Sequence, residues 1–72
     1  MRIEQFSCLD YTQQLQLINR SGKFRKTRIV GDYQFTVFKV GAFYVVLKRN
    51  IRELLFEQIT AMSYDDLPAI YK

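Results

Sequence analysis

The residues best suited to chemistry in this sequence are the basic side chains that gather in its middle. Between Arg20 and Arg52 there are nine lysines and arginines and a single acid, Asp32, so this segment carries a net charge of +8, while the whole 72-residue chain carries +4. Clustered cations attract polyanions and speed their encounter with a protein. The candidate residues for contact with a polyanion or another acidic partner are Lys23, Arg25, Lys26, Arg28, Lys48 and Arg49.

Aromatic residues alternate with these cations, and such rings can serve more than one purpose. Exposed rings on a basic sheet stack the bases of RNA in several binding modules, and Phe38 and Tyr44 are the candidate exposed aromatics here. The sequence has neither an RNP-type signature nor a GXXG loop. Rings on a sheet also build cores, and Lys and Arg protect edge strands against pairing with other chains. Nucleic-acid contact, contact with an acidic protein and edge protection therefore all stay open.

Several kinds of catalytic and metal chemistry lack the residues they need. The chain has no histidine and one cysteine, Cys8, which excludes the usual zinc ligand sets and the Ser-His-Asp and Cys-His arrangements within one chain. The three glycines are spaced as turn residues and not as a phosphate-binding loop. The adjacent pair Asp65 and Asp66 is typical of a helix cap, and Cys8 of a small buried hydrophobe. We expect no catalytic residue, no metal and no cofactor, and therefore no enzyme.

Length and composition indicate one small folded unit. A second domain would be too short to bury its own core, so residues 1–72 are expected to form a single domain. The longest apolar run, Ala42 to Leu47, is far shorter than the roughly 20 residues that span a bilayer. No signal-peptide pattern is present at the N-terminus. We expect a cytoplasmic protein with no membrane partner, and because small cores are marginal, homodimerisation stays open.

The first third of the chain has helical periodicity. Tyr11, Leu15 and Ile18 share one helical face. The helix could begin after Ser7, or after Asp10 with Gln13 completing a capping box. Gly22 is expected to end the helix in the left-handed conformation.

From Lys23 the apolar period changes to two, which predicts a β-meander. Gly31-Asp32 and Gly41-Ala42 have the composition of two-residue hairpin turns. In each of the second and third strands, the apolar residues of one face are expected to form the core. The opposite face of each strand also carries apolar residues, so that face of the sheet is not cleanly polar. The core residues are Tyr33, Phe35, Val37, Phe43, Val45 and Leu47, and the residues left over are Phe38, Val40, Tyr44 and Val46.

The last third fits two structures. A helical spacing relates Ile51, Leu54, Leu55, Ile59 and Met62. Residues 55–62 also alternate in the way of a strand, although neither face is distinctly apolar. Periodicity alone favours the helix. Asn50 is a turn candidate before it. After it, Ser63, Asp65 or Asp66 could cap a short helix that contains Pro68 in its first turn.

A resemblance bears on this choice. It rests on elements spread over most of the chain, namely Phe6 with Leu9, Gly22, Gly31-Asp32-Tyr33, Phe43-Tyr44-Val45, Phe56 with Ile59, and Leu67 with Tyr71. In these the chain resembles a group of small bacterial proteins of uncharacterised function. The resemblance implies a fourth strand over residues 54–61 followed by a short terminal helix, and it implies no activity. That group often has an acid after its FYV motif, where this chain has Val46.

Together these patterns predict an α+β domain, in which an N-terminal helix packs on a three- or four-stranded antiparallel β-meander with a short C-terminal helix. The expected function is that of a small non-enzymatic interaction module, whose basic strand surface contacts an acidic macromolecule such as nucleic acid. The alternative is a module for protein interaction or self-assembly as a homodimer, which would use an apolar face of the sheet.

Overall fold

The computed structural model describes residues 1–53 and 55–71. Four strands form one antiparallel sheet in the order β1-β2-β3-β4, preceded by two helices and followed by two 3-10 turns. The predicted α+β meander is confirmed, with four strands and a helical N-terminus divided in two. The elements are α1 Ile3–Ser7, α2 Tyr11–Ser21, β1 Lys23–Val30, β2 Tyr33–Val40, β3 Phe43–Asn50, β4 Leu55–Met62, η1 Tyr64–Asp66 and η2 Ala69–Tyr71.

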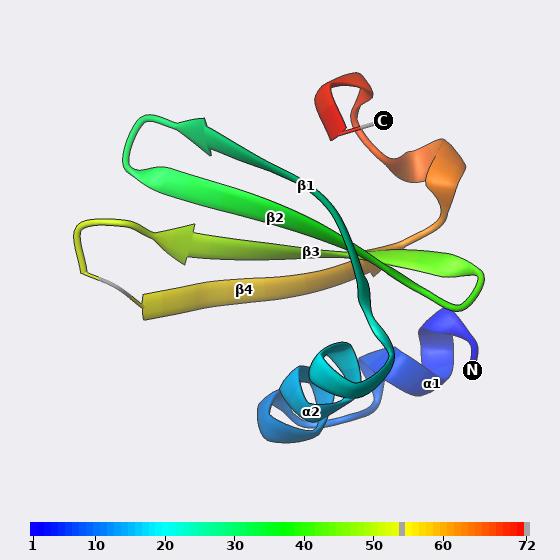
Figure 1. Cartoon of the computed structure of the whole chain (residues 1–72). Coiled ribbons are helices and arrows are strands. Elements are labelled where there is room, and N and C mark those ends of the chain that lie inside the picture. The colour runs from blue at the N-terminus through cyan, green and yellow to red at the C-terminus, as the bar shows by residue number, and fades with distance from the viewer. Residues whose placement is uncertain (54, 72) are drawn as a thin grey trace.

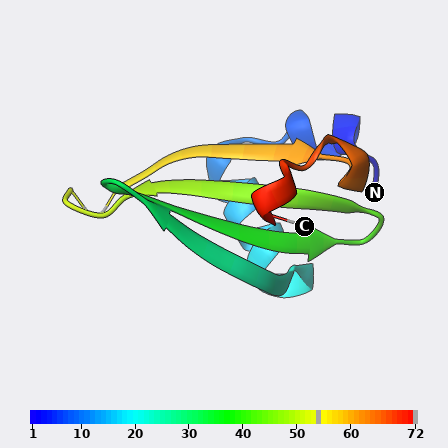
Figure 2. The same cartoon turned by 90° about the horizontal axis from the view of Figure 1, so that it is seen from above.

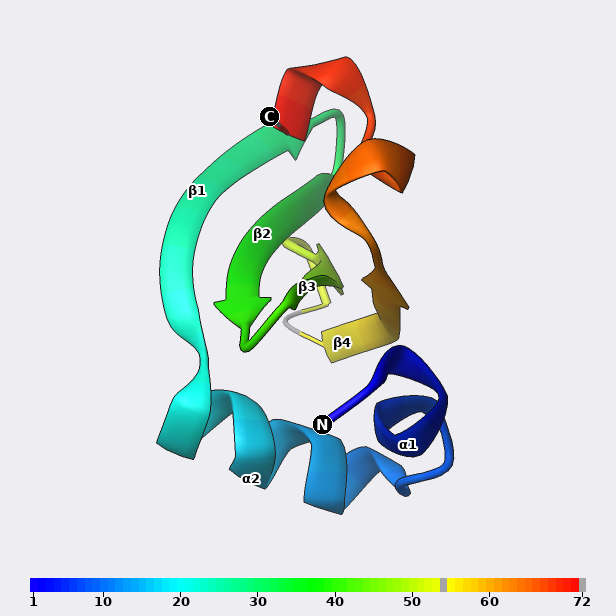
Figure 3. The same cartoon turned by 90° about the vertical axis from the view of Figure 1, so that its right-hand side faces the viewer.

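The sheet is the middle one of three layers. The two helices lie on one side, α1 against β4 and α2 against β2, and the C-terminal turns lie on the other side (Figures 1 and 3). Viewed from above, the C-terminal segment crosses in front of the sheet while the helices lie behind it (Figure 2). We call these two sides the helix side and the C-terminal side.

The helix α2 begins where the second of the two predicted caps places it. Asp10 Oδ1 accepts a hydrogen bond from the Gln13 backbone N–H at 2.8 Å, and Gln13 Oε1 accepts one from the Asp10 N–H at 3.1 Å. Ser7 is instead the last residue of α1. This capping box satisfies two of the backbone donors left open at a helix start.

Gly22 ends α2, but the predicted left-handed conformation is wrong. Its φ is −77° and its ψ is 139°, because the chain passes directly from the helix into the extended β1. The glycine is needed for space, since a Cβ at this position would lie 2.6 Å from the carbonyl oxygen of Ile18.

The two hairpin turns are those predicted. Gly31 and Gly41 have φ values of 61° and 59°, a conformation that glycine adopts at no steric cost. Val30 pairs with Tyr33 across the first turn, and Val40 pairs with Phe43 across the second. These turns fix which residues of neighbouring strands share a face.

The helix side of the sheet holds the larger core. Phe6 from α1 and Ile18 from α2 are almost fully buried against it, and the rings of Phe6 and Phe43 lie 5.6 Å apart. The buried members of this cluster are Phe6, Ile18, Val40, Phe43, Val45 and Leu47.

A second core lies on the C-terminal side, so the single core expected from the sequence is wrong. Val37 pairs with Val46, whereas Val45 pairs with Phe38, and partners in an antiparallel sheet share a face. Val37 and Val45 are therefore both inaccessible to solvent on opposite faces. The apolar residues of the second face are covered by the chain's own C-terminal segment, through Leu67 and Tyr71.

The segment from Leu55 to Met62 is a strand, as the resemblance implied and against its helical periodicity. Pairing with β3 along its whole length outweighs the local pattern. Asn50 forms the expected turn, since its Oδ1 accepts hydrogen bonds from the backbone N–H groups of Arg52 and Glu53 at 3.0 and 3.1 Å. The predicted strand position Leu54 lies outside the described residues.

The choice between the two helix caps can be tested by substitution. Asp10→Ala removes the acceptor for the Gln13 N–H, so the free energy of unfolding should fall by about 1 kcal/mol. Ser7→Ala, at the cap that the chain does not use, should change it by a few tenths of a kcal/mol at most. Urea unfolding followed by circular dichroism measures both, and an equal loss in the two variants would contradict the assignment.

Docking of the C-terminal segment depends on Leu67. This side chain is 4% exposed, whereas Ile70 in the same segment is 50% exposed. Leu67→Ala should therefore lower the free energy of unfolding by about 2–5 kcal/mol, the usual cost of emptying a buried leucine site. Ile70→Ala is the matched control and should cost much less. Similar losses in both would show that Leu67 is not a core residue.

Candidate functional site

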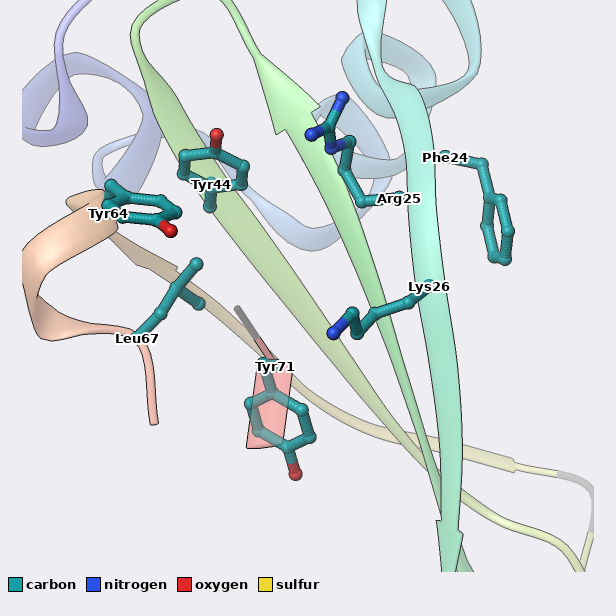
Figure 4. A pocket seen from close by; sticks show the side chains of 7 residues that line it. All are labelled: Phe24, Arg25, Lys26, Tyr44, Tyr64, Leu67 and Tyr71. Carbon is teal, nitrogen blue, oxygen red and sulfur yellow. The ribbon is translucent and has the colours of Figure 1, made fainter. Parts of the chain in front are cut away.

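The site begins with an irregularity in the edge strand β1. Phe24 pairs with Phe38 and Lys26 pairs with Val37, so Arg25 is an extra residue without a partner position on β2. In a regular strand Arg25 and Lys26 would point to opposite faces. The bulge brings both to the C-terminal side, while the ring of Phe24 points to the other side of the strand (Figure 4).

Five of the six predicted cations lie on the C-terminal side of the sheet. The pairing places Arg28 and Lys48 opposite Phe35 on this side, and Lys23 opposite Lys39, which in turn pairs with Tyr44. Arg49 pairs with Gln34 and lies on the helix side. The five are Lys23, Arg25, Lys26, Arg28 and Lys48, and the structure separates Arg49 from them.

A pocket of about 190 Å³ opens between β1 and the C-terminal segment. Arg25 and Lys26 extend into it from β1, facing aromatic side chains that come from β3 and the C-terminal turns (Figure 4). We call it the ring pocket. Its lining residues are Phe24, Arg25, Lys26, Tyr44, Tyr64, Leu67 and Tyr71.

Ring contacts hold the aromatic walls of the ring pocket. The Tyr44 and Tyr64 rings lie 5.7 Å apart at 51°, and the Tyr71 and Phe35 rings lie 5.7 Å apart at 36°. Leu67 lies between Tyr64 and Tyr71 and gives the pocket an aliphatic surface (Figure 4). Burial raises the pKa of Tyr71 further above its ordinary value of 10.0. Its hydroxyl, like that of any tyrosine, is neutral at neutral pH and can donate a hydrogen bond.

A second hollow of about 290 Å³ adjoins the first. It is lined by Ser21, Lys23, Arg25, Lys39 and Gly41, and we call it the lysine pocket. Arg25 lines both pockets and therefore stands at their junction. Among the described residues that line the two pockets, none is acidic. The described lining of the two pockets thus places cations beside aromatic rings.

Arg28 and Lys48 make contacts within the protein close to the ring pocket. Arg28 Nε donates a hydrogen bond to the Ile70 carbonyl oxygen at 3.4 Å and so ties β1 to η2. Lys48 Nζ lies 4.4 Å from the centre of the Tyr33 ring, within cation–π distance. These residues support the structure around the ring pocket and do not line it.

The two rings predicted as exposed are half-buried instead. Phe38 packs against the helix-side core and meets Phe24 edge-on, with ring centres 6.2 Å apart. Tyr44 packs against Tyr64. The more exposed rings are Phe24, at 61%, and Tyr64, at 51%.

Sequence reasoning missed Lys39, Tyr64 and Tyr71 as members of this site. Lys39 could have been found, because the first hairpin turn places it near the start of β1. Tyr64 and Tyr71 carry no local signal, since their position depends on how the C-terminal segment crosses the sheet.

Three further observations bear on other functions. Cys8, expected to be buried, is exposed at the end of α1. Within residues 1–53 and 55–71 no three potential metal ligands of the His, Cys, Asp and Glu types gather in one place. Over the same residues, no helix has the length and apolar character needed to cross a bilayer.

Comparison of the chain with family models, curated proteins and solved structures gave no match. The resemblance noted from the sequence thus contributes an expected fold and nothing more. What the protein does has to follow from the chemistry of the two pockets.

The burial of Tyr71 predicts a pH dependence. Because the folded protein raises this pKa above its ordinary value of 10.0, unfolding makes the phenol easier to ionise. The resulting stability is present below pH 10 and is lost as the pH rises through the pKa of the folded state. Above pH 10 the free energy of unfolding should therefore fall more steeply in the native protein than in Tyr71→Phe. Parallel curves from urea unfolding across this range would contradict the desolvation of Tyr71.

Proposed function

We propose that the protein is a non-enzymatic, cytoplasmic binding module that holds an acidic macromolecule along β1, and that single-stranded nucleic acid fits this site best. The observation that carries the proposal is the β1 bulge. It turns the adjacent cations Arg25 and Lys26 to one side, where they face a pocket walled by tyrosine rings. Cations for phosphates and rings for bases are the two components of single-strand binding sites.

The combination of charge and rings favours a single strand over other polyanions. A duplex keeps its bases stacked inside, so it could contact the cations but could not place a base against a ring. A purely acidic protein segment would likewise leave the aromatic walls unused. A single strand engages Arg25 and the tyrosines at once.

The lining of the ring pocket supports binding over catalysis. Its described residues offer cations, phenols and aliphatic or aromatic surface, but no imidazole, carboxylate or thiol. Those three groups are common general bases and nucleophiles in enzymes.

Self-assembly through the sheet, the alternative raised by the sequence, has less support. The apolar second face on which it depended is occupied by Leu67 and the rest of the C-terminal segment. Strand β1 is an exposed edge, but its cations would lie close to those of a second copy and its bulge interrupts regular pairing.

Salt-dependent binding tests the proposal. A labelled single-stranded RNA should bind at about 50 mM salt and weaken about tenfold or more at 200 mM, because each phosphate contact releases counterions. Arg25→Glu should reduce affinity about tenfold. Arg52→Glu is the matched control, since Arg52 is an exposed arginine in the β3–β4 turn, paired only at the surface with Asp32 at 3.7 Å. Arg52→Glu should change affinity much less.

Three results would contradict the proposal. The first is the absence of RNA binding at the lower salt concentration. The second is tighter binding of polyglutamate than of RNA, which would point to an acidic protein as the partner. Equal losses in Arg25→Glu and Arg52→Glu would show that net charge, and not the site, attracts the strand.

A further inference from the structure

We infer that the ring pocket receives one base of the bound strand, while Arg25 holds the phosphate next to it. This inference rests on the proposed function and adds where the nucleotide lies. It turns a general attraction between cations and phosphates into a defined site for a single nucleotide.

The size of the ring pocket suits one planar ring. Its volume is about 190 Å³, and apolar protein cavities of about 150 Å³ accept benzene. The pocket is therefore large enough for one base with its polar substituents. Tyr64 is 51% exposed and Leu67 is buried, so a base that enters from solvent would meet Tyr64 and need not displace Leu67.

The walls of the pocket meet both the face and the edge of a base. Tyr64 and Tyr44 support each other at 5.7 Å and present a fixed aromatic surface at one end. Lys26 extends from the opposite wall, toward Tyr71 and Leu67 (Figure 4). A base lying against Tyr64 would direct its edge toward the ammonium group of Lys26 and the neutral hydroxyl of Tyr71, which both donate hydrogen bonds to base carbonyls.

The position of the phosphate follows from Arg25, the residue that the two pockets share. Arg25 lines the ring pocket and the lysine pocket, so its guanidinium stands where the backbone would pass from one to the other. Guanidinium groups bind phosphate oxygens in a bidentate manner. Lys23 and Lys39 in the lysine pocket then face the next phosphate along the strand. Base and phosphate sites are thus adjacent, as they are in a nucleotide.

A comparison of strands with and without bases tests the inference. Oligothymidylate and an abasic strand of equal length carry the same phosphates, so only the base separates them. The native protein should bind oligothymidylate about tenfold more tightly, within the range that one stacked base contributes. Tyr64→Leu should remove most of this preference and leave the salt dependence unchanged, because the cations remain. Tyr64→Phe should retain the preference, since stacking needs the ring and not the hydroxyl.

The controls separate this inference from the function on which it rests. Tyr11→Leu changes another exposed tyrosine, 46% accessible on α2, and should leave the preference intact. Circular dichroism and urea unfolding of each variant show whether the fold is retained. Equal, salt-dependent binding of both strands by the native protein would overturn the base site while the proposed function survives. If neither strand binds, both fail.

Discussion

The two central strands must be covered on both faces, and the rest of the structure follows from this constraint. Val37 and Val45 are each inaccessible to solvent, yet they lie on opposite sides of the sheet. The helices cover only one side. The other side is buried by the chain after β4, which crosses back and inserts Leu67. The ring pocket exists because this segment reaches β1 without filling the space beside it.

The Arg25 bulge links two properties of β1, its protection as an edge strand and its surface of cations. An edge strand needs protection against pairing with other chains, and a bulge with clustered cations provides it. The same extra residue moves Phe24 to the helix side and aligns Arg25 with Lys26 on the C-terminal side. Edge protection and an anion-facing surface are therefore compatible, because one backbone irregularity produces both.

The sequence predicted most of the helices, strands and turns, but not which residues share a face of the sheet. Gly31 and Gly41 marked the hairpins, and Asp10 with Gln13 marked the start of α2. The two-residue turn at Gly41 also implies that Val37 lies opposite Val46, so the second core could have been derived from it. The bulge at Arg25 could not, since residues 23–30 have no regular alternation in which an inserted residue would be visible. The ring pocket depends on that bulge and on the path of the C-terminal segment.

The spatial arrangement also reduces the charge that a partner can use. Of the cations that give the middle segment its charge of +8, Arg28 and Lys48 contact the protein itself, and Arg49 lies on the helix side. Four cations line the two pockets, namely Lys23, Arg25, Lys26 and Lys39. If Lys23, Arg25 and Lys39 each neutralise one phosphate of a single strand while Lys26 meets the base, the logarithm of the affinity falls with the logarithm of salt with a slope of about −2. The whole excess charge would instead give roughly −6. The slope thus reports whether a strand is confined to the two pockets or also contacts cations outside them.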